Sequence, residues 1–179
     1  MLLPTDTVYG LVARADVPEG AEAVYRLKGR AARRPTALLA ADVEALLAAV
    51  PELPESPLRT LLPGPFTLVL PNPARRFAWL CGETPEAIGV RVPELPAPAA
   101  AAVAAVGTVL ATSANDPGGA DPRRLSDVPP RIRAGCGAEL DAGELPGTPS
   151  TVLDLTGPEP RVLREGAVPA AAALARLEP

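Results

Sequence analysis

Four short polar stretches of this sequence carry the side chains best suited to hold an anion or a small polar ligand. They are PTDT ending at Thr7, KGRAARRP beginning at Lys28, TSAN with Ser113 and Asn115, and PSTV with Ser150. Lysine and arginine suit the oxygens of a phosphate, and hydroxyl groups orient a polar substrate without adding charge. The chemistry indicated is the positioning of a nucleotide or another phosphate beside a small polar molecule.

Each stretch taken alone also has an ordinary structural explanation. The side chain of Asp6 or Thr7 can bond nearby backbone in a proline turn, and Asn115 can close an Asx turn after a strand. PSTV can be a plain strand entry, and the cations from Lys28 to Arg34 can form a solvated helix end. These alternatives stay open while each stretch is considered by itself.

The composition narrows the chemistry. The chain has 179 residues, a net charge of -4 and no histidine, so the commonest general base near neutral pH is absent. The acidic balance argues against broad attraction to nucleic acid, although it allows a local basic patch. The two cysteines, Cys81 and Cys136, lie far apart and indicate neither a disulfide framework nor a zinc site. The sequence contains neither a Walker-type glycine loop nor a G-x-G-x-x-G motif.

Length and hydropathy indicate the class of protein. One domain with a substantial core is expected at this length. No apolar run approaches the roughly 20 residues of a membrane span, and residues 1–7 are too short for a signal peptide. We therefore expect a cytoplasmic protein that does not contact a membrane.

The stretches that would position these side chains alternate between helix and strand patterns. Helices are predicted in PEGAEAVYRLKGR, in DVEALLAAV with Asp42 as N-cap, at residues 58–62, in APAAAAVAAVG capped by Gly107, and in PAAAALARLEP. Strands are predicted in TALLAA, FTLVLP, AIGVRVP, TVLATSAN, STVLDLTG and PRVLREG. Residues 116–130 are rich in Gly, Pro and Asp and are expected to form a loop. The interleaving predicts an α/β sheet with helices on its faces.

The order of the motifs resembles that of a known family. PTDTVYGL, KGR, PGPFTLVL, GVRVP, TSAN, PSTVLDL and VLREG follow one another between Pro4 and Gly166. In this order they are similar to the threonylcarbamoyl-AMP synthase family, also called TsaC or YrdC. The resemblance implies a twisted mixed α/β sheet with helices on its faces and a large concave cavity. It also implies that residues 1–179 form a single domain, the short form of the family.

The resemblance implies an enzyme of the nucleotidyltransferase class. Family members make threonylcarbamoyl-adenylate from L-threonine, bicarbonate or CO2, and ATP, and they release pyrophosphate. The product feeds the threonylcarbamoyladenosine modification of tRNA, which downstream tRNA threonylcarbamoyl-transferase proteins complete. ATP would be a substrate that carries Mg2+ on its phosphates, and no tightly bound, protein-ligated metal is expected. Catalysis would rest on positioning and charge neutralisation.

The resemblance also implies roles for individual residues. Lys28 and Arg30 would be the catalytic cations, and Thr7, Ser113 and Ser150 would hold threonine. Arg91 of GVRVP would lie at the cavity. The nucleotide would be held by Lys28, Arg30, Arg34, Thr67, Ser113, Asn115 and Arg164.

Some positions depart from the family pattern. Ala31 and Arg34 stand where the family usually has proline and then lysine or asparagine, and Leu95 stands where many members have histidine. Members usually have a helix and a strand ahead of PTDT, where this sequence has only residues 1–3. Either the start is placed too late or the form is shortened. In a shortened form we expect Thr7 to lie on a strand stub without its hydrophobic cover, on a surface that a partner chain fills.

Three other interpretations stay open. The chain could be a non-catalytic YrdC-like protein that binds RNA or a nucleotide, although its acidic charge weakens this. It could be a carbamoyl-transfer domain like those inside larger hydrogenase-maturation proteins, although it has no zinc-finger cysteines and no extra domains. It could also be a paralogue that folds but has lost activity.

Overall fold

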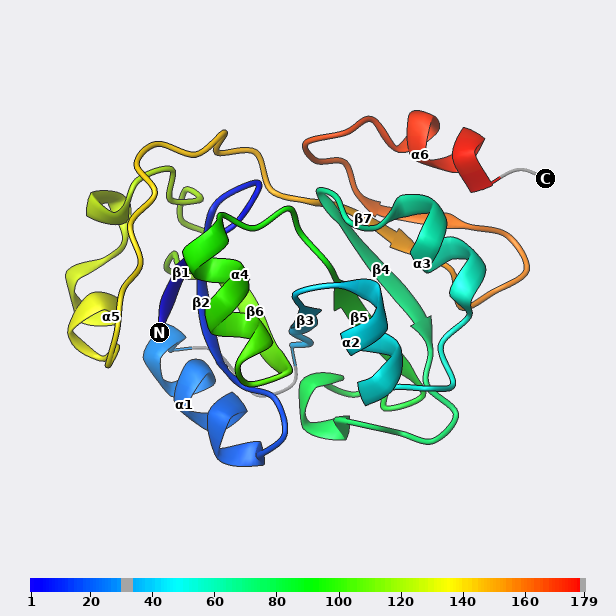
Figure 1. Cartoon of the computed structure of the whole chain (residues 1–179), viewed down its shortest axis with the longest axis horizontal. Helices are drawn as coiled ribbons and strands as arrows, with labels where there is room; N and C mark the ends of the chain where they lie inside the picture. The colour runs from blue at the N-terminus through cyan, green and yellow to red at the C-terminus, as the bar shows by residue number, and fades with distance from the viewer. Residues whose placement is uncertain (30–33, 178–179) are drawn as a thin grey trace.

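The computed structural model describes residues 1–29 and 34–177. These residues form one sheet of eight strands with helices packed against it (Figure 1). The elements in chain order are β1 (Leu2–Pro4), β2 (Tyr9–Arg14), α1 (Pro18–Lys28), β3 (Ala37–Ala40), α2 (Val43–Ala49), α3 (Glu55–Leu61), β4 (Phe66–Pro71), η1 (Ala78–Leu80), β5 (Ala87–Arg91), α4 (Ala97–Ala104), β6 (Thr108–Ser113), η2 (Leu125–Asp127), α5 (Pro130–Ala134), β7 (Thr151–Asp154), β8 (Arg161–Arg164) and α6 (Ala170–Leu177).

The sheet brings together strands that are far apart in the sequence. Their order across the sheet is β1-β2-β6-β3-β5-β4-β7-β8. β3 runs parallel to β5 and β4 runs parallel to β7, while the other neighbouring pairs of described strands are antiparallel. The predicted mixed α/β sheet with helices on its faces is therefore confirmed.

The two faces of the central strands differ in the size of their side chains. In β4, Leu68 and Leu70 are fully buried in the main core, whereas Thr67 and Val69 point to the opposite face and are half-buried. β5 alternates in the same way and places Gly89 on that opposite face. Because successive side chains of a strand point to opposite faces, large residues fill one side and smaller ones leave space on the other. The cavity described below lies over this small-residue face.

A second, smaller core covers part of the same face near β1 and β2. Leu3, Val12 and Leu39 pack there against Ala99 and Val103 of α4. Figure 1 shows α4 crossing in front of β6, and α1 and α6 at opposite ends of the view. The small-residue face is thus divided between α4 and the cavity.

The first strand is well covered. Leu2 is fully buried in the main core and Leu3 in the second core. The strand is also paired along its backbone, since the N–H of Leu2 donates to Ala138 O at 2.9 Å and that of Leu140 donates to Leu2 O at 3.0 Å. The expected strand stub without hydrophobic cover is therefore wrong for β1.

Most of the predicted helices and strands are confirmed, and two of the helix ends have clear physical causes. Asp42 caps α2 as predicted, since its carboxylate accepts the backbone N–H of Ala45 at 2.7 Å. α1 ends at Lys28 because Gly29 adopts the left-handed conformation, with φ 59°, that suits glycine and terminates a helix. The predicted extension of this helix to Arg30 lies outside the described residues.

The sequence does not predict every element. β1, β2 and the short α5 have no clear periodicity, and their formation depends on distant partners. α4 already ends at Ala104, so the expected cap at Gly107 is wrong, although Gly107 has a positive φ of 82° in the turn that follows. No helix in the described part of the chain has the length and apolar character needed to cross a membrane.

Gly166 follows β8 and lies against the entry to β7. A Cβ atom on Gly166 would meet Pro149 O at 2.3 Å and the carbonyl carbon of Ser150 at 2.4 Å. Both are backbone atoms, so they cannot rotate away as a flexible side chain can. This close approach requires a residue without a side chain.

Gly166→Ala is therefore expected to lower the free energy of unfolding by about 1–3 kcal/mol, the usual cost of overpacking. Urea unfolding followed by circular dichroism measures the change. Gly157→Ala is the matched control, since a Cβ there would have Glu159 O as its nearest atom, at 3.9 Å. Equal stability of the two variants would contradict the close approach at Gly166.

Candidate functional site

A cavity of about 560 Å³ lies over the small-residue face of the sheet. Its volume falls within the range of sites that hold small organic ligands. The end of α1, several central strands and the loop after β6 build its wall. The sequence-predicted site residues that line it are Lys28, Arg34, Thr67, Arg91, Ser113, Asn115, Ser150 and Arg164.

Two predicted residues are not in this lining. Arg30 lies outside the described residues. Thr7 is fully buried behind the wall, and Thr5 lines the cavity in its place. The Thr7 hydroxyl lies 3.0 Å from Thr5 Oγ1 and accepts from Arg91 Nη2 at 3.2 Å, so it is engaged within the protein. Its side chain thus contacts two wall residues, Thr5 and Arg91, and the predicted contact of Thr7 with threonine stays a prediction.

Lys28 reaches the cavity from the last turn of α1. It is only 3% exposed, so the alternative of a solvated helix end is wrong for this residue. Its ammonium group donates to the Ser113 carbonyl and to Asn115 Oδ1, the latter at 3.0 Å. A buried cation is tolerated where polar partners replace water. The cation is therefore held in one place at the cavity wall.

Asn115 connects several of the polar groups. Its Oδ1 accepts from Lys28 and from Ser113 Oγ at 2.8 Å, while its Nδ2 donates to Gly119 O at 2.7 Å and to Asp121 Oδ1 at 3.3 Å. An asparagine side chain offers two donors and two acceptor sites, so all four are engaged. Asn115 thus positions its neighbours. The Asx turn of the structural alternative is wrong, because Oδ1 accepts from two side chains and Pro117, two residues on, has no N–H to donate.

A second polar group forms where β7 begins. Ser150 Oγ lies 2.8 Å from Thr67 Oγ1, which the parallel neighbour β4 supplies. Arg164 of β8 donates to the Ser150 carbonyl at 3.0 Å from Nε and at 2.8 Å from Nη2. Burial lowers the pKa of Arg164, and the nearby carboxylate of Asp121 opposes this shift. A fixed guanidinium group therefore lies beside two hydroxyl groups.

A buried ion pair closes one end of the cavity. Arg91 Nη2 lies 2.8 Å from Asp6 Oδ1, and the two side chains are 11% and 10% exposed. The backbone N–H of Glu94 donates to Asp6 Oδ2 at 3.2 Å. Burial raises the pKa of Asp6, against the effect of Arg91, and burial also lowers the pKa of Arg91. Nε of Arg91 is buried without a hydrogen-bond partner among the described residues.

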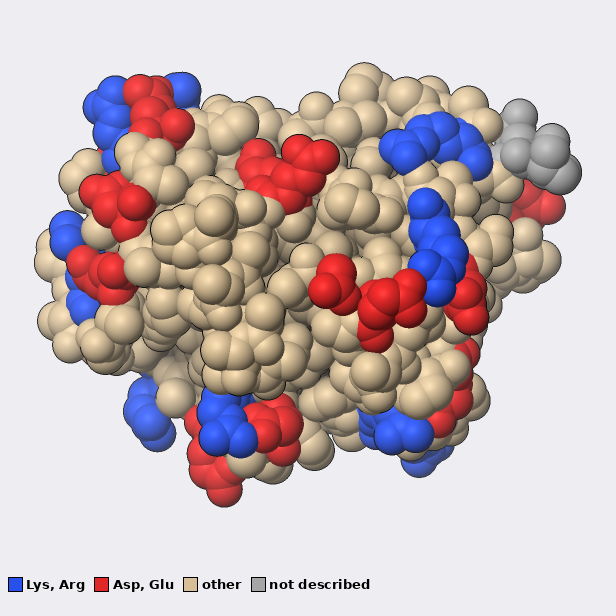
Figure 2. All heavy atoms as spheres, viewed as in Figure 1, with Lys and Arg blue, Asp and Glu red and all other residues tan. Residues whose placement is uncertain are grey.

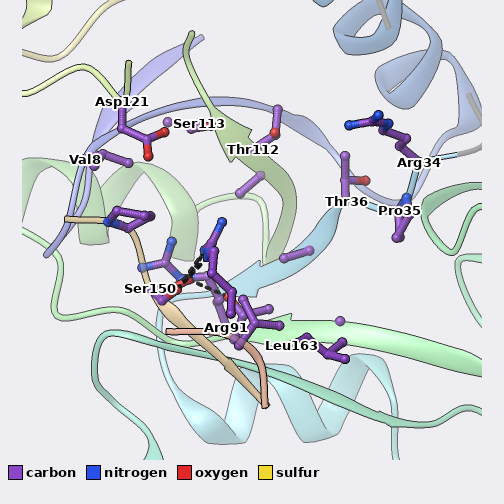
Figure 3. Close-up of a pocket in the computed structure, with 18 of the residues that line it drawn as sticks. Val8, Arg34, Pro35, Thr36, Arg91, Thr112, Ser113, Asp121, Ser150 and Leu163 are labelled. Atoms are coloured by element: carbon purple, nitrogen blue, oxygen red, sulfur yellow. Dashed lines mark hydrogen bonds between the residues drawn. The ribbon is translucent and has the colours of Figure 1, made fainter. Parts of the chain in front are cut away.

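Polar and apolar residues both line the cavity. In Figure 3, Asp121, Ser113 and Val8 lie on one side, and Arg34 and its neighbours lie on the other. The remaining lining includes the apolar residues Val69, Ala87 and Leu163 and the thiol of Cys81. Burial raises the pKa of that thiol, which makes it less reactive.

Sequence reasoning missed Thr5, Asp6 and Asp121. Thr5 and Asp6 belong to the PTDT motif, so the signal was present, but the partner of Asp6 lies far along the chain. Asp121 lies in the loop after β6 and no sequence pattern marks it. In the described ranges, no group of three or more His, Cys, Asp or Glu side chains is arranged to hold a metal ion.

Comparison with known proteins identifies the family. Residues 1–166 match the Sua5/YciO/YrdC family model, which is described as telomere recombination. The chain belongs to this family. The threonylcarbamoyl-AMP synthase of Pyrococcus abyssi is 32% identical over 170 residues, which cover 93% of this chain and 50% of the relative. The enzyme of that name from Halorhodospira halophila is 34% identical over 145 residues, which cover 78% of this chain and 72% of the relative.

Solved structures agree with this assignment. The structure of P. abyssi Sua5 complexed with L-threonine matches with a TM-score of 0.86 at 30% identity, over 98% of this chain and 52% of that one. The structure of Escherichia coli YciO matches with a TM-score of 0.73 at 28% identity, over 93% of this chain and 82% of that one. The chain therefore spans about half the length of the P. abyssi protein. The YrdC-like fold implied by the motifs is confirmed.

The ion pair at the end of the cavity gives a test of stability. Asp6→Asn keeps the shape of the side chain but leaves the Arg91 guanidinium buried without a counter-charge. We expect the free energy of unfolding to fall by roughly 3 kcal/mol, as for other broken buried pairs. Urea unfolding at neutral pH measures this loss.

Asp16→Asn is the matched control. Asp16 pairs with Arg14 on the surface, where both side chains are more than half exposed and water screens the interaction. Its replacement should change stability little. If both variants unfold at the same urea concentration, the Asp6 pair does not stabilise the fold in the way described.

Proposed function

We propose that this protein is a threonylcarbamoyl-AMP synthase that joins L-threonine, bicarbonate or CO2, and ATP, and releases pyrophosphate. The observation that carries the proposal is one cavity in which fixed cations and hydroxyl groups from separate motifs converge. Relatives that carry this name, and the P. abyssi structure with L-threonine, support it.

The reaction needs little proton transfer from the protein. The threonine amine attacks CO2, and loss of one proton gives a carbamate. A carbamate oxygen then attacks the α-phosphorus of ATP, and the bond to the pyrophosphate leaving group breaks. The carbamate is already anionic, so the second step needs no protein base. Charge neutralisation at the phosphates is then the main task of the protein, which suits a chain without histidine.

The positions of the side chains suggest which of them bind the amino acid and which bind the nucleotide. The hydroxyl group of Ser150 suits the small polar amino acid, and Thr67 and Arg164 lie beside it, where the nucleotide would begin. Lys28, Arg34 and Arg164 are the described cations that we propose for the nucleotide, together with Arg30. Arg91, already paired with Asp6, serves as a fixed part of the wall. Mg2+ would enter on the phosphates of ATP, where it commonly keeps few protein ligands.

The product is proposed to pass to downstream tRNA threonylcarbamoyl-transferase proteins in the cytoplasm. Direct RNA binding is the alternative role. Figure 2 shows acidic and basic side chains interspersed on one face, with an uncharged area over α4. That face offers no continuous basic surface for phosphate contacts.

Pyrophosphate release by the purified chain tests the function directly. The assay contains ATP and Mg2+, with L-threonine and bicarbonate present or omitted one at a time. We expect release only when both are present. Binding of ATP or RNA without any release of pyrophosphate would instead favour the non-catalytic alternative.

Replacement of Lys28 tests the role of the principal cation. Lys28→Met keeps most of the buried stem and removes the charge, so pyrophosphate release should fall about 100-fold or more, as when one positioned donor is lost. Arg26→Met, on the exposed side of the same helix, is the control and should retain activity. Circular dichroism checks that both variants fold. Near-normal turnover by Lys28→Met would remove Lys28 from the mechanism.

A further inference from the structure

A second hollow of the molecule lies beside α4. It is a groove of about 230 Å³ between the C-terminal half of this helix and the strands β1, β2 and β6. Apart from Arg14, the described residues that line the groove are apolar, and they include Met1, Val12 and Val106. Among the described residues, none lines both the groove and the cavity. The groove is therefore a separate surface that can receive apolar side chains.

The exposed side of α4 continues this apolar surface. Residues 95–115 contain no charged side chain, although the chain has 17 Lys and Arg and 21 Asp and Glu. Pro98 and Ala101 of α4 are exposed, and Val106 in the turn that follows is 50% exposed. Figure 2 shows the resulting uncharged area over α4. Contiguous apolar surface and depletion of charge are typical of the centre of a protein–protein interface.

Two charged side chains of opposite sign flank this surface. Glu94 precedes α4, and its carboxylate makes no ion pair or hydrogen bond with a described residue, although its backbone N–H bonds Asp6. Arg14 lines the groove and pairs with Asp16 through Nε and Nη2, so its Nη1 donates to no described residue. Asp6 precedes β2 and Arg14 ends it, so Glu94 and Arg14 lie at opposite ends of the surface.

We propose that α4 and the groove beside it join two copies of this chain about a two-fold axis. In this dimer each α4 runs antiparallel to its counterpart. The exposed Pro98 and Ala101 in the first half of one helix then meet the groove beside the second half of the other. The same symmetry sets Glu94 of one copy against the partner's Arg14, and each contact forms twice.

The distribution of charge favours a second copy over a partner of another kind. A two-fold axis requires a surface that complements itself, and an uncharged centre with opposite charges at its two ends meets this requirement. A uniformly acidic or basic partner would instead place a like charge against Glu94 or Arg14. The small side chains of α4 also allow two helices to pack closely.

Sedimentation equilibrium of the full chain at a series of concentrations tests the dimer. We expect the mass to rise from 18.3 kDa toward twice that value as the concentration increases. Ala101→Glu places a carboxylate in the middle of the surface, and burial of this unpaired charge should weaken the dimer about 100-fold or more. Ala172→Glu, on the exposed side of α6, is the matched control and should dimerise like the wild type. Circular dichroism checks that both variants fold.

Charge reversal tests the orientation of the two copies. Glu94→Arg alone sets like charges against each other twice in each dimer, so we expect dimerisation to weaken about 10-fold. Combining Glu94→Arg with Arg14→Glu restores opposite charges, and this double variant should dimerise within about threefold of the wild type. Because the two side chains lie at opposite ends of the surface, such recovery requires a contact between two copies.

The other possible results count against the dimer. A wild-type chain that stays at 18.3 kDa at every concentration would overturn the proposal. If that monomer bound a hydrophobic dye that Ala101→Glu excludes, the groove would belong to a different apolar partner. A dimer that Ala101→Glu leaves intact would also overturn it, since the copies would then meet through another surface. The wild-type measurement needs no variant, so it decides even if a variant folds poorly.

Discussion

The buried pair of Asp6 and Arg91 is the interaction on which the arrangement of the cavity depends. Asp6 lies in the turn between β1 and β2, and Arg91 ends β5, with β6 and β3 between them in the sheet. The pair therefore ties the first hairpin to the centre of the sheet across the end of the cavity. Arg91 also donates to Thr7, so the turn cannot shift without exposing two buried charges. The pair therefore holds the turn between β1 and β2 in place beside the cavity.

The same principle governs two of the other cations in the cavity lining, Lys28 and Arg164, each of which has a partner that orients it. Asn115 and the Ser113 carbonyl hold Lys28, and the Ser150 carbonyl holds Arg164. Cations that are fixed before a ligand arrives stabilise developing negative charge without reorganisation. The net charge of -4 is compatible with this, because many of the other arginines form ion pairs with exposed carboxylates, while four cations line the cavity.

Local patterns predicted much of the fold, and most of the site residues predicted from motif order line the cavity. The β-rich run FTLVLP predicted β4, because the preference of such residues for a strand can be read from a short stretch of sequence. The partner of Asp6 could not be predicted, since it depends on which strands become neighbours in the sheet. The same limit applies to the hydrogen bond between Thr7 and Arg91, which also joins residues far apart in the sequence. The place of Asp121 in the cavity lining depends on the path of the loop after β6, and no periodic pattern in the sequence predicts that path.

The cavity exists because the face of the sheet that would normally be packed is built from small or polar side chains. Gly89 and Thr67 line the cavity with little side-chain volume. A Cβ atom on Gly89 would lie 3.8 Å from Thr67 Cγ2, in ordinary van der Waals contact, so the space between them would be filled. A larger residue there would fill space that the ligand needs, although it would bury more apolar surface. The fold therefore lacks hydrophobic packing where the cavity lies, and the continuous core on the other face of the sheet stabilises it. The candidate site is therefore an unfilled part of the sheet face with oriented charged side chains around it.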